Sequence, residues 1–115
     1  MTLLNEGLNK VANELSSLVT VGQYGTGTTL PSFTDTGLET AVGASSKSLT
    51  SAASGPSFTL THSLSSTEAN SNTFTEFITD FADSSTLTRS VFEGVTKQAT
   101  IELTTITTIN IIRGG

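Results

Sequence analysis

The chain is 115 residues long with a formal net charge of −5 and no cysteine, and Ser and Thr together supply about a third of its positions. This length indicates one domain with one hydrophobic core, and the absence of cysteine excludes disulfides and thiolate metal sites. The basic residues are scattered, so we expect no nucleic-acid partner. No run reaches the ~20 apolar residues of a membrane span, so we expect no membrane partner. The N-terminus lacks the pattern of a leader, so we expect no processing.

The first 18 residues have the apolar spacing of an amphipathic helix. Apolar side chains recur at alternating intervals of four and three positions, with polar residues between them. The simplest interpretation is a helix packed on the sheet of its own domain, and the alternative is a short oligomerisation seam, because the spacing also fits a heptad. The stripe consists of Leu4, Leu8, Val11, Leu15 and Leu18.

A strand and a structured loop are predicted after the helix. Residues 19–21 are rich in β-branched side chains, and the segment 22–31 contains three glycines that permit backbone conformations closed to other residues. Thr36 and Glu39 have the spacing of a capping box, in which a hydroxyl and a carboxylate satisfy free N–H groups at a helix start. We therefore expect a short helix near residues 37–42.

Strand signals dominate the second half of the chain. Residues 44–55 suit an edge strand or an irregular crossing, whereas residues 58–64 alternate apolar and hydroxyl side chains as in a half-buried strand. Residues 73–81 carry large apolar groups on both faces, which indicates a central or bulged strand. A turn over residues 82–85 then leads to an expected strand over residues 87–92.

The last predicted strand is unusually long. A strand over residues 97–112 could span ~50 Å, so it either bends at a bulge or reaches a neighbouring molecule. Both of its faces contain apolar residues, because Ile106 and Ile112 lie opposite the main apolar face. That main face would consist of Ile101, Leu103, Thr105, Thr107, Ile109 and Ile111.

Together these elements predict a mainly β fold, an antiparallel β-sandwich or barrel-like module in a single domain over residues 1–115. The N-terminal helix would cover residues 1–18, the β module residues 19–112 with a short helix near 37–42, and a flexible end residues 113–115.

Self-assembly is the main functional expectation from the residue pattern. A cysteine-free domain of this size has a limited core, yet both faces of the final strand require cover. A neighbouring copy is the simplest cover for Ile106 and Ile112, and the helix stripe offers a second contact. We therefore expect a homo-oligomer, either a ring or a trimer.

Residues that could perform catalysis or hold a ligand do not form a recognisable set. The segment Gly25–Thr28 lacks the lysine of a phosphate-binding loop, so a shaped turn is the better interpretation. His62 is the single histidine and lies on the apolar face of a strand, where we expect a satisfied core histidine rather than a metal ligand or a catalytic base. We predict no catalytic residue, no cofactor, no metal site and no enzymatic activity.

The densest acidic patch of the sequence is best explained by solvated or ion-paired carboxylates. Strand alternation places Glu76 and Asp80 on one face about 13 Å apart, too far for the two carboxylates of a retaining glycosidase. Arg89 or Lys97 is the expected ion-pair partner across the strands. The patch contains Glu68, Glu76, Asp80 and Asp83.

Three sequence blocks occur in an order found in one family of proteins. Over roughly residues 20–112, the chain resembles small structural proteins of tailed viruses and related prophages. Members of that family contain four segments in a fixed order. These are a Gly-Thr-rich loop ending in proline, an Asp-containing segment, a Glu-Ala-Asn turn with a following strand, and a strand with Leu, Arg and Phe. The corresponding residues here are Gly25–Pro31, Thr34–Val42, Glu68–Asn70, Glu76–Phe81, Leu87, Arg89, Phe92, Val95 and Lys97.

The resemblance implies a component of a virus particle that is assembled in the host cytoplasm and contacts itself and other virion proteins. Members often occur near tail or fibre genes, so tail, baseplate or fibre attachment is slightly favoured over head decoration or a turret. The chain departs from the family in having no Trp in its last strand. The alternative is a receptor- or carbohydrate-binding module of a fibre or spike, although aromatic residues that could stack on sugars are scarce and Tyr24 is the only Tyr.

Overall fold

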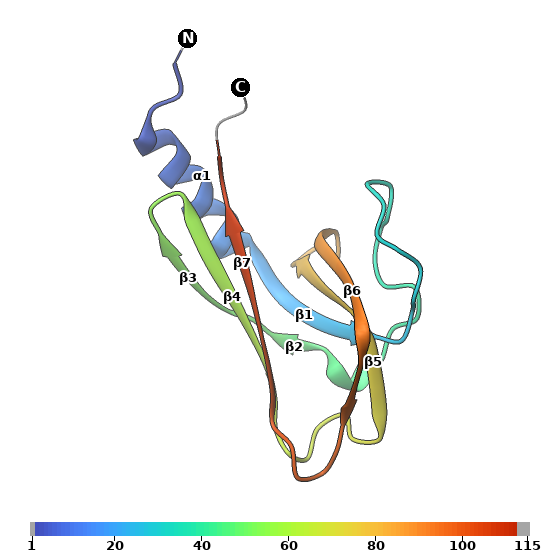
Figure 1. Ribbon diagram of the computed structural model, residues 1–115. Coiled ribbons are helices and arrows are strands. Elements are labelled where there is room, and N and C mark those ends of the chain that lie inside the picture. Colours follow the sequence, from blue (N-terminus) through green and yellow to red (C-terminus); the bar gives the residue numbers. More distant parts are fainter. Residues whose placement is uncertain (1, 113–115) are drawn as a thin grey trace.

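The computed structural model describes residues 2–112, which form one helix and two antiparallel β-sheets (Figure 1). The predicted flexible end at residues 113–115 lies outside the described residues. The predicted β-sandwich is confirmed, with two separate sheets rather than one closed, barrel-like sheet among the described residues. The elements in chain order are α1 (Asn5–Leu18), β1 (Val19–Gly25), η1 (Gly43–Ser45), β2 (Lys47–Ser48), β3 (Thr50–Ser54), β4 (Ser57–Leu64), β5 (Asn72–Phe81), β6 (Thr86–Lys97) and β7 (Leu103–Asn110).

The two sheets differ in size and in the strands that lie at their edges. Sheet A has the strand order β2-β1-β5-β6, and sheet B has the order β3-β4-β7. The segment 44–55 thus supplies the edge strands β2 and β3, as one of its two interpretations predicted. Strand β5 lies between β1 and β6, which confirms the prediction of a central strand.

The core lies between the two sheets and consists of two apolar clusters. The alternation in β4 directs Phe58, Leu60 and Leu64 inward, where all three are buried. Phe58 and Leu60 pack with Ala12 and Val19, while Leu64 belongs to the other cluster. That second cluster contains Tyr24, Leu64, Phe74 and Phe77.

Strand β5 fits large apolar groups on both faces because its pairing is irregular. The register with β6 shifts between Phe74 and Glu76, as it does at a β-bulge. Phe74 and Phe77 therefore both enter the core although they are three positions apart, and Glu76 and Ile78 lie on the opposite face of sheet A. The predicted bulge is confirmed.

The helix stripe divides into a buried row and an exposed row. Leu8 and Ala12 are buried, and Leu15 is half-buried against the core cluster of β1 and β4. The helix thus packs on its own domain, which was the simpler prediction. The exposed row contains Val11 and Leu18, seven positions apart, and Leu4 is exposed in the extended residue just before the helix.

The predicted short helix near residues 37–42 is wrong. These residues form bends, and only the three-residue turn η1 follows them. The Glu39 side chain does not close a capping box, because it accepts hydrogen bonds from the backbone N–H groups of Thr28 and Thr29. The Glu39 N–H donates to Glu76 in sheet A. Distant partners therefore satisfy the groups that a helix start would have used.

The predicted continuous strand over residues 97–112 is also wrong. Strand β6 ends at Lys97, and a turn that contains a hydrogen bond from the Ile101 N–H to the Gln98 carbonyl precedes β7. Ile101 is exposed in this turn instead of facing the core. From Leu103 onward the predicted alternation is confirmed, because the odd-numbered residues are half-buried and the even-numbered residues are exposed.

Candidate functional site

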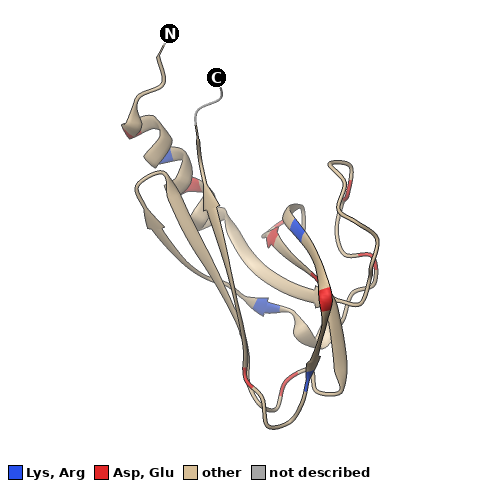
Figure 2. Cartoon of the chain, viewed as in Figure 1, with Lys and Arg blue, Asp and Glu red and all other residues tan. Residues whose placement is uncertain are grey.

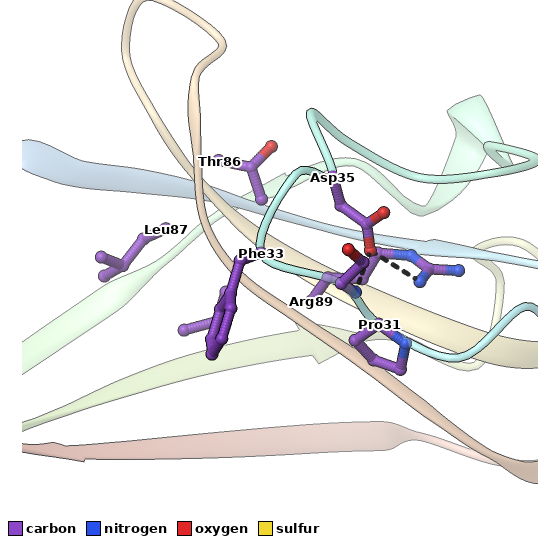
Figure 3. A pocket seen from close by; sticks show the side chains of 8 residues that line it. Pro31, Phe33, Asp35, Thr86, Leu87 and Arg89 are labelled. Atoms are coloured by element: carbon purple, nitrogen blue, oxygen red, sulfur yellow. Dashed lines mark hydrogen bonds and ion pairs between the residues drawn. The ribbon is translucent and has the colours of Figure 1, made fainter.

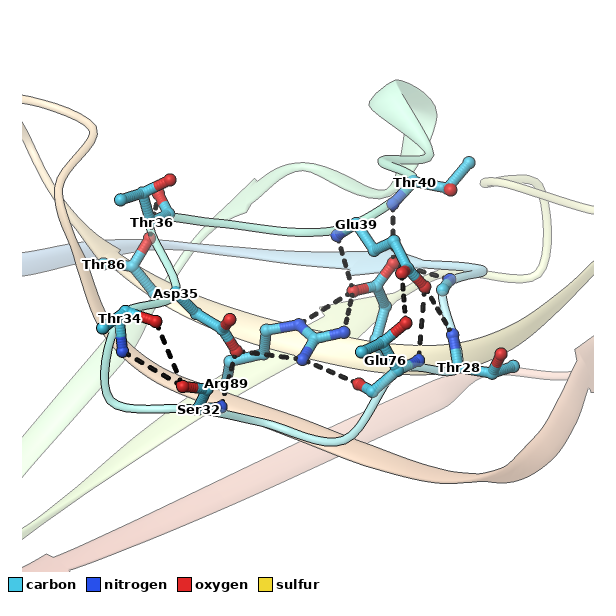
Figure 4. A network of polar contacts seen from close by, with 12 residues as sticks. Thr28, Ser32, Thr34, Asp35, Thr36, Glu39, Thr40, Glu76, Thr86 and Arg89 are labelled. Atoms are coloured by element: carbon cyan, nitrogen blue, oxygen red, sulfur yellow. Dashed lines mark hydrogen bonds and ion pairs between the residues drawn. The ribbon is translucent and has the colours of Figure 1, made fainter.

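A long loop over residues 26–42, here called the arm loop, projects from sheet A and is fixed at its base by one buried carboxylate (Figures 1 and 4). Glu76 of β5 is 0% exposed. Its Oε2 accepts hydrogen bonds from the N–H groups of Gly27 at 2.6 Å and Thr40 at 2.9 Å, and its Oε1 accepts one from the Glu39 N–H at 2.9 Å. One side chain therefore holds both ends of the arm loop.

Arg89 of β6 connects this carboxylate to the outer part of the arm loop. Its Nε lies 3.1 Å from Glu76 Oε1, and its NH1 donates to the Thr29 carbonyl at 2.9 Å and to Asp35 Oδ2 at 3.1 Å. The ion pair between Glu76 and Arg89 confirms the prediction of a cross-strand partner for the acidic patch. Figure 4 shows the Arg89 guanidinium between the carboxylates of Glu76 and Asp35.

Close packing at the base of the arm loop requires glycine at position 27. A Cβ atom added to Gly27 would lie 2.4 Å from Glu39 Cβ and 2.5 Å from Glu76 Oε2. Any side chain at this position would therefore push the Glu76 carboxylate away from its three backbone donors. The glycine-rich segment acts here through close approach of the backbone to a carboxylate.

The hydrogen bonds to Glu76 keep this buried group ionised. Burial by itself would raise the pKa of Glu76. The hydrogen bonds from the N–H groups of Thr40, Glu39 and Gly27 and from the Arg89 guanidinium together outweigh this effect, so the pKa lies below its usual range. The pKa of Glu39 is lowered by its hydrogen bonds with the hydroxyl and N–H of Thr29 and with the N–H of Thr28. The arm loop is therefore held by charged carboxylates at neutral pH.

The outer face of sheet B is a continuous uncharged surface. None of the residues of β3, β4 and β7 is Lys, Arg, Asp or Glu, and Figure 2 shows the three strands free of charged positions. Ile106 pairs with Thr61 and is 65% exposed on this face. The other members of the face are small or hydroxyl-bearing: Thr50, Ala52, Ser54, Ser57, Thr59, Thr61, Ser63, Thr104, Thr108 and Asn110.

Strand β7 also forms an unprotected edge. It pairs only with β4 among the described residues, in a regular register of eight residue pairs without a bulge. It contains no proline and no charged residue, which are the usual means of blocking an edge strand. The edge strand β6 differs, because it carries Arg89, Glu93 and Lys97 and its pairing with β5 is irregular.

His62 and Lys97, the other residues singled out in the sequence, are both part of the packed interior. His62 is fully buried, its Nε2 lies 2.8 Å from the Ser45 carbonyl, and its ring contacts Tyr24 and Phe77 edge-on. Burial lowers the pKa of His62, with a smaller opposing effect from its hydrogen bond to the Ser45 carbonyl. Lys97 is buried and donates to the Asn70 side chain, so it is not the partner of the acidic patch.

Glu68 and Asp80 have different environments from Glu76. Glu68 forms an ion pair with Lys47, and hydrogen bonds with Lys47 and Ser65 lower its pKa to about 2. Burial raises the pKa of Asp80. In the described part of the chain, no three His, Cys, Asp or Glu side chains gather in an arrangement that could hold a metal ion. Over the same residues, no helix has the length and apolar character needed to cross a membrane.

Sequence reasoning missed the exposed aromatic residue of the arm loop. Phe33 is fully exposed and Leu30 of the same loop is 79% exposed, while Tyr24, the only Tyr of the chain, is buried. A single Phe among polar residues produces no periodic signal, so only its position in the fold reveals its exposure.

Comparisons with family models, curated proteins and solved structures produced no match to the chain.

Proposed function

We propose that the chain is a structural, non-enzymatic protein of a virus particle that assembles with copies of itself through sheet B. The observation that carries this proposal is the edge strand β7, which combines a regular unpaired edge, an uncharged face and the exposed Ile106. An uncharged edge strand without blocking features favours pairing with another chain. The resemblance of the sequence to virion proteins of tailed viruses supports the proposal that this assembly is part of a virus particle.

The apolar residues at this edge extend beyond the strand. Ile112 follows β7 and is 80% exposed, and Ile106 lies on the same, outward side of the alternating segment. Fully burying two isoleucine side chains contributes on the order of 1.5–3 kcal/mol each. Backbone hydrogen bonds along the edge would add to this contribution in a ring or a trimer.

The exposed row of α1 provides a second contact in this assembly. Val11 and Leu18 are exposed on α1 seven positions apart, as one position of a heptad would be, and Leu4 is exposed in the extended residue just before α1. Three residues form a short seam, so we assign the helix a supporting role and sheet B the main one. The preferred location is the tail, the baseplate or the point of fibre attachment, with other virion proteins as further partners.

The proposal is tested by measuring the mass of the purified chain with light scattering after size exclusion. Replacing Ile106 and Ile112 together by Thr should convert the oligomer to monomer while the far-ultraviolet circular dichroism spectrum is unchanged. Leu30→Thr is the matched control, because it removes an equally exposed apolar side chain outside sheet B. A double variant that assembles like the parent refutes the role of β7. A parent chain that stays monomeric at high concentration and is absent from purified particles refutes the function.

A further inference from the structure

A hollow of about 590 Å³ lies between the arm loop and the beginning of β6 (Figure 3). This volume falls in the range of sites that bind small molecules. The arm loop and β6 each contribute four residues to its wall. The lining residues are Pro31, Ser32, Phe33, Asp35, Thr86, Leu87, Thr88 and Arg89.

The apolar part of the hollow is centred on Phe33. Its ring is fully exposed, although burying a phenyl ring away from water is favourable. Figure 3 shows the ring between Leu87 on one side and the pair of Asp35 and Arg89 on the other. Among the described residues, Phe33 is the one aromatic side chain that offers an open ring face, because the others are buried or half-buried.

The polar part of the hollow is a carboxylate held in a fixed orientation. Asp35 Oδ2 accepts hydrogen bonds from the Ser32 N–H at 2.9 Å and from Arg89 NH1 at 3.1 Å. Arg89 is itself fixed by the buried Glu76. No described residue donates to Asp35 Oδ1, so this oxygen remains an oriented acceptor in a partly exposed side chain. The fixed arm loop therefore prepares an acceptor beside an aromatic face.

The charges of the hollow disfavour an anionic ligand. The positive charge of Arg89 is neutralised by two carboxylates, Glu76 and Asp35, and its side chain is only 5% exposed. The chain as a whole carries a net charge of −5. Phosphates, sialic acids and uronic acids would therefore meet a negative potential. A purely apolar partner would desolvate Asp35 without supplying a donor, which is also unfavourable.

From this combination, we propose that the hollow binds a neutral pyranose sugar. The C–H groups on one face of the sugar ring carry a partial positive charge and stack on the negative face of the Phe33 ring. A sugar hydroxyl donates to Asp35 Oδ1, and hydroxyl groups of the hollow such as that of Ser32 can exchange hydrogen bonds with the remaining sugar hydroxyls. This site lies on the arm loop and β6, away from β7, so it adds a binding activity to the proposed assembly function.

The first test uses a variant that also supplies its own signal. The chain contains no Trp, so Phe33→Trp places a single indole in the hollow. Titration with methyl glucopyranoside and methyl galactopyranoside should change the fluorescence of this indole. The larger aromatic face should also tighten binding several-fold relative to the parent, as measured by ligand-observed NMR. If neither methyl glycoside binds the parent chain and a glycan array with the intact chain is blank for neutral sugars, the proposal is overturned.

Two further variants locate the site. Phe33→Ala should weaken the NMR-measured affinity by about tenfold or more, whereas Leu30→Ala, an equally accessible apolar residue outside the hollow, should leave it unchanged. Asp35→Asn should weaken binding as well. Circular dichroism checks that this substitution, which alters the hydrogen bonds of the arm loop, has not unfolded the protein. Unchanged affinity in Phe33→Ala, or binding of acidic glycans alone on the array, overturns the proposal. The Ile106 and Ile112 double variant should bind the methyl glycosides like the parent, which separates this test from that of assembly.

Discussion

Replacing Glu76 by Gln should cost the protein a large part of its stability. The amide keeps the shape of the side chain but removes one acceptor oxygen and the charge that faces Arg89. At least one of the N–H groups of Gly27, Glu39 and Thr40 then loses its acceptor at a buried or partly buried position. An orphaned N–H costs ~1–3 kcal/mol and breaking a buried ion pair ~3–5 kcal/mol. Because the amide oxygen retains some of these contacts, we expect a loss of about 3–5 kcal/mol.

Urea denaturation followed by far-ultraviolet circular dichroism measures this loss. For a small domain, 4 kcal/mol corresponds to a decrease of about 2 M in the urea midpoint. Glu93→Gln is the matched control, because it makes the same chemical change on an exposed position of β6 and should stay within about 0.5 kcal/mol. A Glu76→Gln variant within about 1 kcal/mol of the parent would show that the buried carboxylate does not hold the arm loop.

Two additional measurements check the physical cause. Combining Glu76→Gln with Arg89→Met should cost less than the sum of the single changes, because the second replacement removes the cation that has lost its buried partner Glu76. The pKa of Glu76 is lower in the folded chain than its usual value, so the unfolded chain binds the proton first. Its stabilising contribution is thus fully present above the usual pKa and lost as the pH falls through the lowered value, and Glu76→Gln should lack this part of the acid dependence.

Three further predictions concern the core, the arm loop and pH. Leu8→Ala should destabilise the fold by ~2–5 kcal/mol and Leu4→Ala by less than ~0.5 kcal/mol in urea denaturation, because the first side chain is buried and the second exposed. Gly27→Ala should lower the thermal midpoint by several degrees, on the order of 1 kcal/mol or more, whereas Gly43→Ala, where an added Cβ meets nothing within 4 Å, should leave it unchanged. Burial lowers the pKa of His62, so its neutral form is favoured on folding and stability should fall as the pH drops below ~6.5, by at most ~1.4 kcal/mol per pH unit. Urea titrations at two pH values should show a smaller pH dependence for His62→Gln, and equal dependence would contradict the assignment.

Two failures of the sequence interpretation have the same physical origin. Thr36 and Glu39 have the spacing of a capping box, yet Glu39 binds the backbone ten and eleven positions earlier. The run over residues 97–112 has a strand-like alternation, yet it is interrupted by the turn that returns the chain from sheet A to sheet B. A local pattern reports which groups need partners or cover, and it does not report which distant segment supplies them.

The sequence by itself determined which faces of the regular strands are buried. A period of two is a local property, so β4, the inward side of β7 and the outward position of Ile106 and Ile112 could all be predicted from their neighbours. The bulged central strand could be predicted from its large apolar groups on both faces, and the packing of the helix on its own domain from its apolar stripe. The assembly residues of sheet B were therefore accessible to sequence analysis, although their role stays a prediction.

Only the tertiary structure decided how the arm loop is held and what it presents. Gly27 and Glu76 are 49 positions apart, and the hydrogen bond between them depends on the pairing of β1 with β5 and on the bulge that turns Glu76 away from the core. The orientation of Asp35 depends in the same way on Arg89, which lies 54 positions away. A buried charge needs partners from several segments at once, so its surroundings are a property of the folded chain and not of any stretch of its sequence.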